Sequence, residues 1–295
     1  MNNEMYENVK NNKGFIAALD QSGGSSGKTL ALYGIGEDKY HSDEEMFDLI
    51  HEMRKRVITS KAFTNEHILG TILFEKTMLS KIGDKFTADY LWEDKKIVSF
   101  LKVDKGLKEL DNGVKLMKDI PDLEDLLHVA LDKHIFGTKM RSVIYEANAD
   151  GIRDIVNQQF EFAEIICKNN LVPIIEPEVD INAEEKELCE KLLKEEIIKH
   201  LNSWNKDYKI MFKFTIPTVP NYYLDLYNYD FIVRIVALSG GYTNEKACNL
   251  LALNNKMIAS FSRALLEGLK VDQTDEEFDN MLNDSINRIY EASIT

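Results

Sequence analysis

Lys213 interrupts an otherwise apolar stretch, IMFKFTI at residues 210–216, and this setting suggests chemistry. Burial would penalise its charged form, so the side chain would lose its proton more easily than a lysine in water. A neutral amine is a nucleophile that can form a Schiff base with a ketone, and a second cation such as Lys139 would favour the neutral form further. The alternatives are a buried Lys–Glu ion pair and a lysine that extends to the surface from an edge strand. The strand alone does not decide between them.

A pair of glutamates, Glu176 and Glu178, occurs in the segment IIEPE. Side chains alternate along a strand with a period of two, so both carboxylates would project from the same side. Mutual repulsion and nearby cations separate the pKa values of paired acids, which lets one acid move protons while the other stays ionised. Asp20 ends another apolar segment, FIAALD, and is a third candidate acid. The alternative interpretation is that E-P-E forms a solvated rim of the fold.

Two glycine-rich turns could bind an anion through their backbone N–H groups. The first, QSGGSSGK, follows Asp20 and departs from both the P-loop pattern and G-x-G-x-x-G, so it does not predict a nucleotide site. The second is Ser239-Gly240-Gly241, and Arg263 follows further along the chain. Arginine suits bidentate contact with phosphate, although an arginine at a helix start more often forms an ordinary surface salt bridge. These residues allow a phosphorylated small substrate.

The elements that must position these residues are short apolar runs, which recur between longer helical patterns and are typical of buried parallel strands. Eight such runs occur, at residues 15–20, 68–74, 97–104, 137–143, 171–177, 210–216, 231–238 and 257–262. Alternating strands and helices predict the α/β class, and eight strands favour a closed (β/α)8 TIM barrel over an open doubly wound sheet. The active site of such a barrel lies at the carboxyl ends of its strands, where the candidate residues occur.

Helix signals lie between the strands. Ser42 with Glu45, and Thr274 with Glu277, predict capping boxes at two helix starts. Apolar faces are predicted in two helices, formed by Met46, Ile50, Met53 and Val57 and by Leu188, Leu192, Ile197 and Leu201. The last predicted helix contains Phe278 and Met281. The segment 217–230 is too short and aromatic for a regular crossover helix. The 295 residues contain no linker-like segment, so we expect one barrel domain over residues 1–295.

Composition restricts the partners and cofactors. The chain has 50 acidic and 36 basic residues, and the resulting net charge of −14 opposes non-specific binding to nucleic acid or an anionic membrane. Its six histidines show no metal-binding spacing, so we expect no metal and no other cofactor. Three widely spaced cysteines argue against a disulfide framework, and no apolar leader or membrane span occurs. We therefore expect a cytoplasmic protein.

Seven segments, in order, resemble motifs of the class I, Schiff-base-forming fructose-1,6-bisphosphate aldolases. They are FIAALDQSGGS, LKVDKG, GTKMRS, PIIEPE, MFKFTIPT, ALSGG and FSRAL, and the resemblance covers about the whole chain. The chain length and the sequence DQSGG are more similar to the compact bacterial branch of that family than to its animal members. Animal members end in a tyrosine that carries a proton, whereas this chain ends EASIT and its last tyrosine is Tyr290.

The resemblance implies a role for each matching residue. Lys213 would form the iminium with the substrate's C2 ketone, and Glu176 would be the acid/base that helps the carbinolamine lose water. Glu178 and Lys139 would be the electrostatic neighbours of Glu176, while Asp20 would accept the C4 hydroxyl proton as the C3–C4 bond breaks. Two groups of residues would bind the phosphates, with Ser239, Gly240, Gly241 and Arg263 at the C1 end, Lys105 and Arg141 at the C6 end, and Ser22 as a further candidate.

The implied reaction is reversible cleavage of fructose 1,6-bisphosphate into dihydroxyacetone phosphate and glyceraldehyde 3-phosphate, in glycolysis and gluconeogenesis, without a metal. Two alternatives are an aldolase of another ketose phosphate, such as tagatose bisphosphate or fructose 1-phosphate, and a catalytically silent barrel used for binding. Lys105 and Arg141 favour a second phosphate, and the intact set of acids and lysines argues against a silent barrel. The expected partner is the sugar phosphate, and a homo-oligomer is left open.

Overall fold

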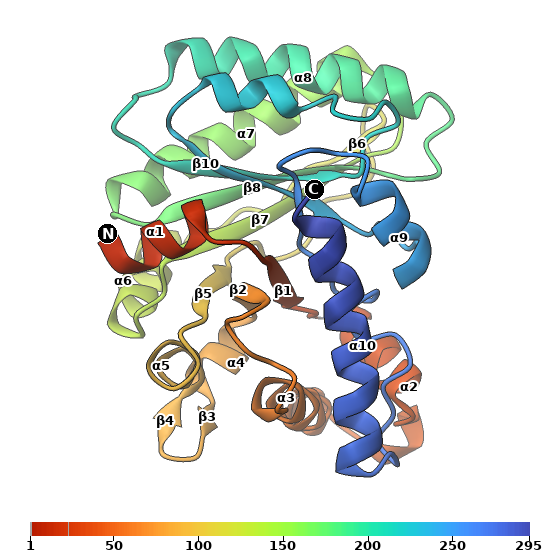
Figure 1. The fold of residues 1–295 in the computed structure, drawn as a ribbon. Helices are drawn as coiled ribbons and strands as arrows, with labels where there is room; N and C mark the ends of the chain where they lie inside the picture. The colour runs from red at the N-terminus through yellow and green to blue at the C-terminus, as the bar shows by residue number, and fades with distance from the viewer. Residues whose placement is uncertain (1, 23) are drawn as a thin grey trace.

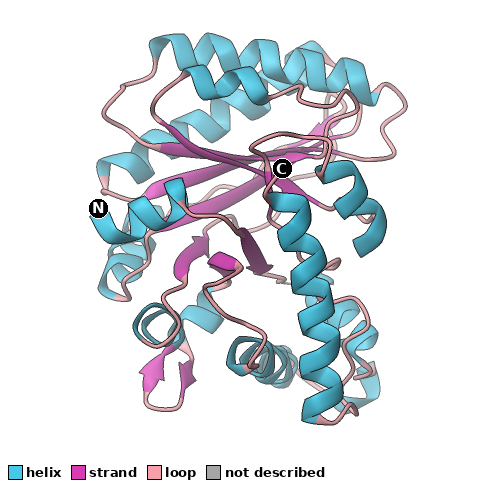
Figure 2. Ribbon diagram, in the orientation of Figure 1, coloured by secondary structure: helices cyan, strands magenta, loops and turns pink. Residues whose placement is uncertain are grey.

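The computed structural model describes residues 2–22 and 24–295, and its central feature is a parallel sheet that curls into a barrel. All eight predicted strands are confirmed, and Figure 2 shows them inside a layer of helices. In sheet order they are β1 (Phe15–Leu19), β2 (Ile68–Leu73), β5 (Val98–Lys102), β7 (Gly137–Ile144), β8 (Val172–Val179), β9 (Ile210–Thr215), β10 (Ile232–Leu238) and β11 (Ile258–Ala259). The predicted α/β class and (β/α)8 barrel are therefore confirmed.

The barrel closes at a seam between its first and last strands. The backbone N–H of Ala18 in β1 donates to the carbonyl oxygen of Phe261, just beyond β11, at 3.0 Å. β11 has only two residues, whereas β7 and β8 on the opposite side have eight each and pair along their whole length. Backbone ladders therefore hold the seam less firmly than they hold the opposite wall. Two short antiparallel pairings lie outside this path, β6 (Val114–Lys115) with β7 and β3 (Lys81–Ile82) with β4 (Lys85–Phe86).

Helices connect the strands and cover the outside of the barrel (Figure 1). α7 and α8 pack together over the β7–β8 side, and α10 packs against β1 and β11 at the seam. The helices are α1 (Asn3–Asn11), α2 (Gly24–Tyr33), α3 (Asp43–Thr59), α4 (Glu75–Leu79), α5 (Thr87–Glu93), α6 (Leu123–Asp132), α7 (Ala149–Lys168), α8 (Lys186–Ser203), α9 (Asn244–Leu251) and α10 (Asp275–Ser293). Within residues 217–230 only a 3-10 turn forms, η2 (Leu224–Asn228), and a second such turn is η1 (Glu37–Lys39). None of the helices in the described ranges combines the length and apolar character needed to cross a bilayer.

Alternation along the strands separates two apolar cores. In β1, Ile16 and Ala18 belong to the cluster that fills the barrel, whereas Phe15, Ala17 and Leu19 pack with the surrounding helices. This division follows from the period of two, because successive side chains leave a strand on opposite faces. Each strand therefore has one set of side chains that faces the barrel interior as far as its carboxyl end, and another set that faces the helices.

α1 closes the amino end of the barrel. Its residues Met5 and Val9, four apart, are 3% and 0% exposed and join the inner cluster. The Asn2 side chain caps this helix by accepting from the backbone N–H groups of Glu4 and Met5. Burial of two such side chains stabilises this plug by about 3–6 kcal/mol in total. The opposite, carboxyl end of the barrel lies away from this plug.

One of the two predicted capping boxes is confirmed. At the start of α10, the Thr274 hydroxyl accepts from the Glu277 backbone N–H, and the Glu277 carboxylate accepts from the Thr274 backbone N–H. At the start of α3, Ser42 accepts from the Glu45 backbone as predicted, at 3.2 Å. The Glu45 carboxylate instead accepts from the backbone N–H of His41 at 2.6 Å, so the second half of that prediction is wrong by one residue.

The predicted helix faces are confirmed for α3 and only in part elsewhere. The α3 residues Met46, Ile50, Met53 and Val57 are all buried. In α8 the prediction is confirmed for Ile197 and Leu201. It is wrong for Leu188, which is 39% exposed, and Leu192 is only partly buried, because the buried face at that end runs through Cys189 and Leu193 instead. In α10, Phe278 is buried whereas Met281 is 40% exposed.

Candidate active site

A cavity of about 460 Å³ opens at the carboxyl end of the barrel. It brings together ten of the twelve residues that the sequence analysis selected, which are Asp20, Ser22, Lys139, Arg141, Glu176, Glu178, Lys213, Ser239, Gly240 and Arg263. They come from β1, β7, β8, β9, β10 and the segment after β11, so no two neighbouring strands could supply the set alone. Five basic and four acidic side chains line the cavity. The local charge therefore opposes the net charge of −14 and suits an anionic substrate.

Strand periodicity explains why these side chains meet. In β8, Val172 and Ile174 belong to the inner cluster, so Glu176 and Glu178 continue that face into the mouth. In β9, Met211 belongs to the inner cluster, and Lys213 follows two residues later. The apolar filling of the barrel thus ends where the polar cavity begins, and one face of each strand supplies both.

Lys213 lies at one end of a chain of close ionic contacts across the cavity floor. Its Nζ is 3.1 Å from Glu176 Oε1, and the other oxygen of that carboxylate is 3.1 Å from Lys139 Nζ. Lys139 Nζ is in turn 2.7 Å from Asp20 Oδ2. All four side chains are buried, with Lys213 4% and Lys139 3% exposed. The contacts therefore lie in a nearly water-free environment, where charges interact strongly.

Lys139 is the charged centre of this cluster. Burial by itself would lower its pKa, but the carboxylates of Asp20, Glu176 and Asp104 outweigh that effect and hold the pKa well above its usual range. Burial likewise opposes ionisation of Asp20, yet Lys139 and Lys213 outweigh it, so the pKa of Asp20 lies well below its usual range. Both groups are therefore charged at neutral pH.

The two central lysines differ in their anionic surroundings. Among residues 2–22 and 24–295, Lys139 is within 4 Å of three carboxylates, whereas Lys213 forms an ion pair with one, Glu176, which it shares with Lys139. The ammonium group of Lys139 therefore has the larger set of anionic partners, and its pKa lies well above its usual range. The geometry therefore favours Lys213 as the nucleophile and Lys139 as a permanent cation.

Glu178 is placed differently from Glu176. One of its carboxylate oxygens accepts from Arg141 Nε at 2.5 Å. Burial would lower the pKa of Arg141, but the attraction of Glu178 outweighs it, and the pKa of Arg141 lies above its usual range. Glu178 thus orients the Arg141 guanidinium at the rim of the cavity, while Glu176 faces the two lysines.

The Ser239-Gly240-Gly241 turn divides between two cavities. Ser239 and Gly240 line the cavity described above, whereas Gly241 lines a neighbouring cavity of about 250 Å³. Gly240 has a φ of +62°, and a Cβ there would lie 2.4 Å from the side chain of Ile181. Glycine is thus required at this turn both by the backbone conformation and by the close approach of Ile181.

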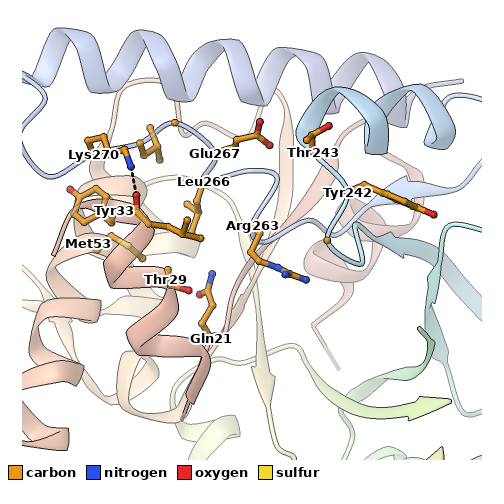
Figure 3. A pocket seen from close by; sticks show the side chains of 14 residues that line it. Gln21, Thr29, Tyr33, Met53, Tyr242, Thr243, Arg263, Leu266, Glu267 and Lys270 are labelled. Carbon is orange, nitrogen blue, oxygen red and sulfur yellow. Dashed lines mark hydrogen bonds between the residues drawn. The ribbon is translucent and has the colours of Figure 1, made fainter. Parts of the chain in front are cut away.

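Figure 3 shows the side chains that line this neighbouring cavity. Two of them, Gln21 and Arg263, also line the first cavity, so the two cavities share part of their walls. The other walls are formed largely by α2, α3 and the segment after β11, including Tyr33 and Met53. A side chain that moves at this boundary would therefore alter the shape of the first cavity.

The structure does not bring Lys105 to the cavity. Its Nζ pairs with Glu75 at 3.3 Å and with Asp122 at 3.6 Å, in ion pairs that are partly exposed to solvent. Lys102 lines the cavity instead, and its Nζ donates to Asp104 Oδ1 at 2.6 Å. The inner positions of β5 include Val98 and Phe100, so the period of two places Lys102 and Asp104 inward and Lys105 outward.

Asp104 and Gln21 are cavity residues that the sequence analysis did not select. Asp104 is 5% exposed, accepts from Lys102, and lies 3.9 Å from Lys139. Its signal was present in the sequence, because Asp104 continues the inner face of β5. Tyr290, by contrast, lies at the other end of the barrel, where its ring packs 4.4 Å from that of His67 just before β2.

Fold and site together define a class of protein, a (β/α)8 barrel whose mouth holds a buried amine beside several acids and among groups that suit anions. The family model described as "Fructose-bisphosphate aldolase class-I" matches residues 3–219. A curated relative from Clostridium acetobutylicum, named "Fructose-bisphosphate aldolase class 1", is 59% identical over 295 residues, which is 100% of both chains. A solved structure of fructose-bisphosphate aldolase from Plasmodium falciparum, in complex with TRAP and a small-molecule inhibitor, superposes with a TM-score of 0.72 at 19% identity. That match covers 99% of this chain and 94% of the other.

The chain therefore belongs to the class-I fructose-bisphosphate aldolase family, and it is an enzyme, a lyase. The solved structure independently supports the barrel fold. The resemblance that the seven sequence segments indicated is thus confirmed at the level of the family.

Proposed function

We propose that this enzyme cleaves fructose 1,6-bisphosphate reversibly into dihydroxyacetone phosphate and glyceraldehyde 3-phosphate through a Schiff base on Lys213. The observation that carries the proposal is the position of the Lys213 amine. It is buried at the floor of the cavity, 3.1 Å from Glu176, while Lys139 takes the remaining anionic contacts of the cluster. This arrangement lets one lysine act as a nucleophile beside a second lysine that stays charged.

Schiff-base formation begins when the neutral Lys213 amine attacks the C2 ketone. Glu176 is within hydrogen-bonding reach of the Lys213 amine, so it can take a proton from the attacking nitrogen and return one to the carbinolamine hydroxyl, which leaves as water. The resulting iminium withdraws electrons from the C3–C4 bond. Lys139 keeps its positive charge beside Glu176 throughout the reaction.

Cleavage requires a base at the C4 hydroxyl. Asp20 lies on the far side of Lys139 from Glu176, so the two acids can serve different carbons of the substrate. Asp20 is ionised at neutral pH and can accept the C4 hydroxyl proton as the C3–C4 bond breaks and its electron pair moves into the iminium. The aldehyde product leaves, and the enamine that remains on Lys213 takes a proton at C3 before hydrolysis.

The two phosphates would be bound at separate basic groups around the mouth. Ser239, Gly240 and Arg263 would hold one phosphate, with backbone N–H groups and a guanidinium as donors. Lys102 and Arg141 would contact the other, and Lys102 takes the place that the sequence analysis gave to Lys105. Ser22 lines the same cavity and would contribute a hydroxyl. Basic groups from several strands favour a substrate with two phosphates over one with a single phosphate.

We further propose that residues 1–295 act as one barrel domain in the cytoplasm, with the sugar phosphate as partner. A comparison of initial rates on fructose 1,6-bisphosphate, tagatose 1,6-bisphosphate and fructose 1-phosphate tests the substrate. We expect the highest kcat/KM for fructose 1,6-bisphosphate, and a higher value for either of the other sugars would overturn the assignment. Lys213→Met should abolish cleavage while the protein still folds, whereas Lys105→Met serves as a control outside the cavity.

A further inference from the structure

Arg54 is a buried cation next to a residue of the catalytic cavity, Gln21, and the reaction steps proposed above assign it no role. It lies on α3 and is 1% exposed, the largest side chain in the structure that is fully buried. Its Nη1 donates to the hydroxyl of Thr77 in α4 at 2.6 Å. Its Nη2 donates to the backbone carbonyl of Gln21 and, at 3.3 Å, to the side-chain oxygen of the same residue. Arg54 thus reaches from the outer helices to the residue directly after Asp20.

The burial of Arg54 is costly, which calls for an explanation. Burial lowers the pKa of Arg54 to about 10, with Asp20 as the charge that opposes this, so the guanidinium is still positive at neutral pH. Among residues 2–22 and 24–295 no carboxylate forms a direct ion pair with it, and its Nε has no hydrogen-bond partner. A methionine or leucine could fill the same space between two helices without these costs. Packing of α3 alone therefore does not explain an arginine here.

Gln21 links Arg54 to the other side of the barrel seam. Its side-chain amide donates to the hydroxyl of Ser262 at 2.5 Å. Ser262 lies in the segment that follows β11, directly before Arg263, and both residues line the catalytic cavity. The connection therefore runs from Arg54 through Gln21 to Ser262, and it joins the end of β1 to the end of β11.

This connection crosses the barrel where backbone pairing is sparse. Below it, the seam is joined by the bond from Ala18 N–H to the Phe261 carbonyl, and β11 has only two residues. Asp20 stands on one side of the seam and Arg263 on the other. A substrate that uses Asp20 as base and Arg263 as phosphate ligand must span the seam. The width of the seam therefore determines the distance between the C4 hydroxyl and the Asp20 carboxylate.

We propose that Arg54 is a positioning residue for the cleavage step, which acts through Gln21 and Ser262 to fix the distance between Asp20 and the phosphate-binding Arg263. The proposal rests on the function proposed above. Arg54 does not line the catalytic cavity, whereas Gln21 lines both that cavity and its apolar neighbour. Loss of the connection would let the seam open toward that neighbouring cavity, and Asp20 would move away from the C4 hydroxyl. Lys213 would keep its place, because it lies on β9, which is not one of the two strands at the seam.

The test separates cleavage from Schiff-base formation. Arg54→Lys keeps the charge but cannot bond Thr77 and both oxygens of Gln21 at once, and Gln21→Met removes the amide that bonds Ser262. Arg56→Lys is the matched control, since Arg56 is also on α3 and bonds several partners, but its partners lie around Tyr33 and Gln273. Each protein is measured for kcat and KM on fructose 1,6-bisphosphate, for melting temperature, and for covalent capture of dihydroxyacetone phosphate by borohydride, which requires Lys213 but no bond cleavage.

We expect kcat to fall about 10- to 100-fold in Arg54→Lys and Gln21→Met, because displacement of a reacting group by about 1 Å costs up to about 100-fold. Capture by borohydride should stay at the wild-type level. The double variant should be no slower than the slower single variant, because both changes break one connection, and Arg56→Lys should keep kcat within about twofold. If Arg54→Lys does not fold, Gln21→Met decides by the same criteria.

Two results would overturn the proposal. One is a kcat within twofold of wild type in Gln21→Met and in any folded Arg54→Lys. The other is a parallel loss of cleavage and capture, which indicates a general structural role. Failure of the proposed function looks different, since the wild-type protein itself would then show no capture of dihydroxyacetone phosphate.

Discussion

Replacement of Lys139 by methionine tests the electrostatic description of the site. The change removes a cation whose Nζ lies 2.7, 3.1 and 3.9 Å from the carboxylates of Asp20, Glu176 and Asp104. Methionine has a similar length and would fill the space, so the chief effect is electrostatic. Lys139 is only 3% exposed, so water screens its contacts with the buried acids weakly.

The expected loss of stability follows from this geometry. Removal of one partner from a buried ion pair costs about 3–5 kcal/mol, because the other charge stays buried without compensation. At roughly 2–4 °C per kcal/mol for a large domain, the melting temperature should fall by roughly 6–20 °C. Lys105→Met is the matched control: its exposed pairs with Glu75 and Asp122 predict a change below about 1 kcal/mol.

The cost should depend on pH in a defined direction. The pKa of Asp20 in the folded wild type is well below its usual value of about 3.8, so this acid adds stability above that pH and loses it as the pH falls. Without Lys139, burial dominates and raises the pKa of Asp20. Protonation of Asp20 then removes an unpaired buried charge and stabilises the variant. The stability difference between the two proteins should therefore be constant from about pH 6 to 9 and shrink from about pH 5 to 3.

Urea unfolding of the wild type, Lys139→Met and Lys105→Met at pH 7 and pH 4 provides the measurement. A loss below 1 kcal/mol in Lys139→Met at pH 7 would refute the assignment of this residue as the charged centre. So would a loss of equal size at both pH values, because it would indicate a packing defect and not the buried acids.

Three further predictions concern substrate binding, the phosphate turn and metal. Lys102→Met should raise KM for fructose 1,6-bisphosphate about tenfold or more, whereas Lys105→Met should leave it unchanged, and the reverse pattern in steady-state kinetics would restore Lys105 as the phosphate ligand. Gly240→Ala should lower stability by about 1–3 kcal/mol and raise KM, since its Cβ would clash with Ile181. A crystal structure of the variant in which the turn and Ile181 keep their wild-type positions would contradict this explanation. Prolonged treatment with EDTA should leave the rate unchanged because the iminium is the electron sink, and recovery of lost activity on addition of a divalent ion would contradict this.

The sequence predicted those parts of the site that interrupt apolar strands. Lys213 and Glu176 are polar residues in buried β-segments, and burial of such groups has a cost that a function or an ion pair must offset. Lys102 was missed although the same alternation that aligned Glu176 with Glu178 also aligns it with Phe100. The motif LKVDKG contains two lysines, and only the phase of the strand shows which of them faces inward.

Arg54 also left a signal in the sequence. It lies four residues after Ile50 and four before Ile58, both of which are fully buried, so it stands in the middle of an apolar helix face. Its partners could not be predicted, because Gln21 approaches it from the loop after β1 and Thr77 from α4. The same holds for Glu190 in α8, whose carboxylate accepts from the distant Thr218 backbone. Contacts between segments far apart in sequence require the folded structure.

Covalent capture at a single lysine tests the central claim most directly. The protein is mixed with dihydroxyacetone phosphate, reduced with borohydride, weighed intact by mass spectrometry, and digested to locate the modification. We predict one added sugar phosphate per chain, attached at Lys213, with no such addition in Lys213→Met. Attachment at Lys139 or an unchanged mass of the wild-type protein would contradict the account.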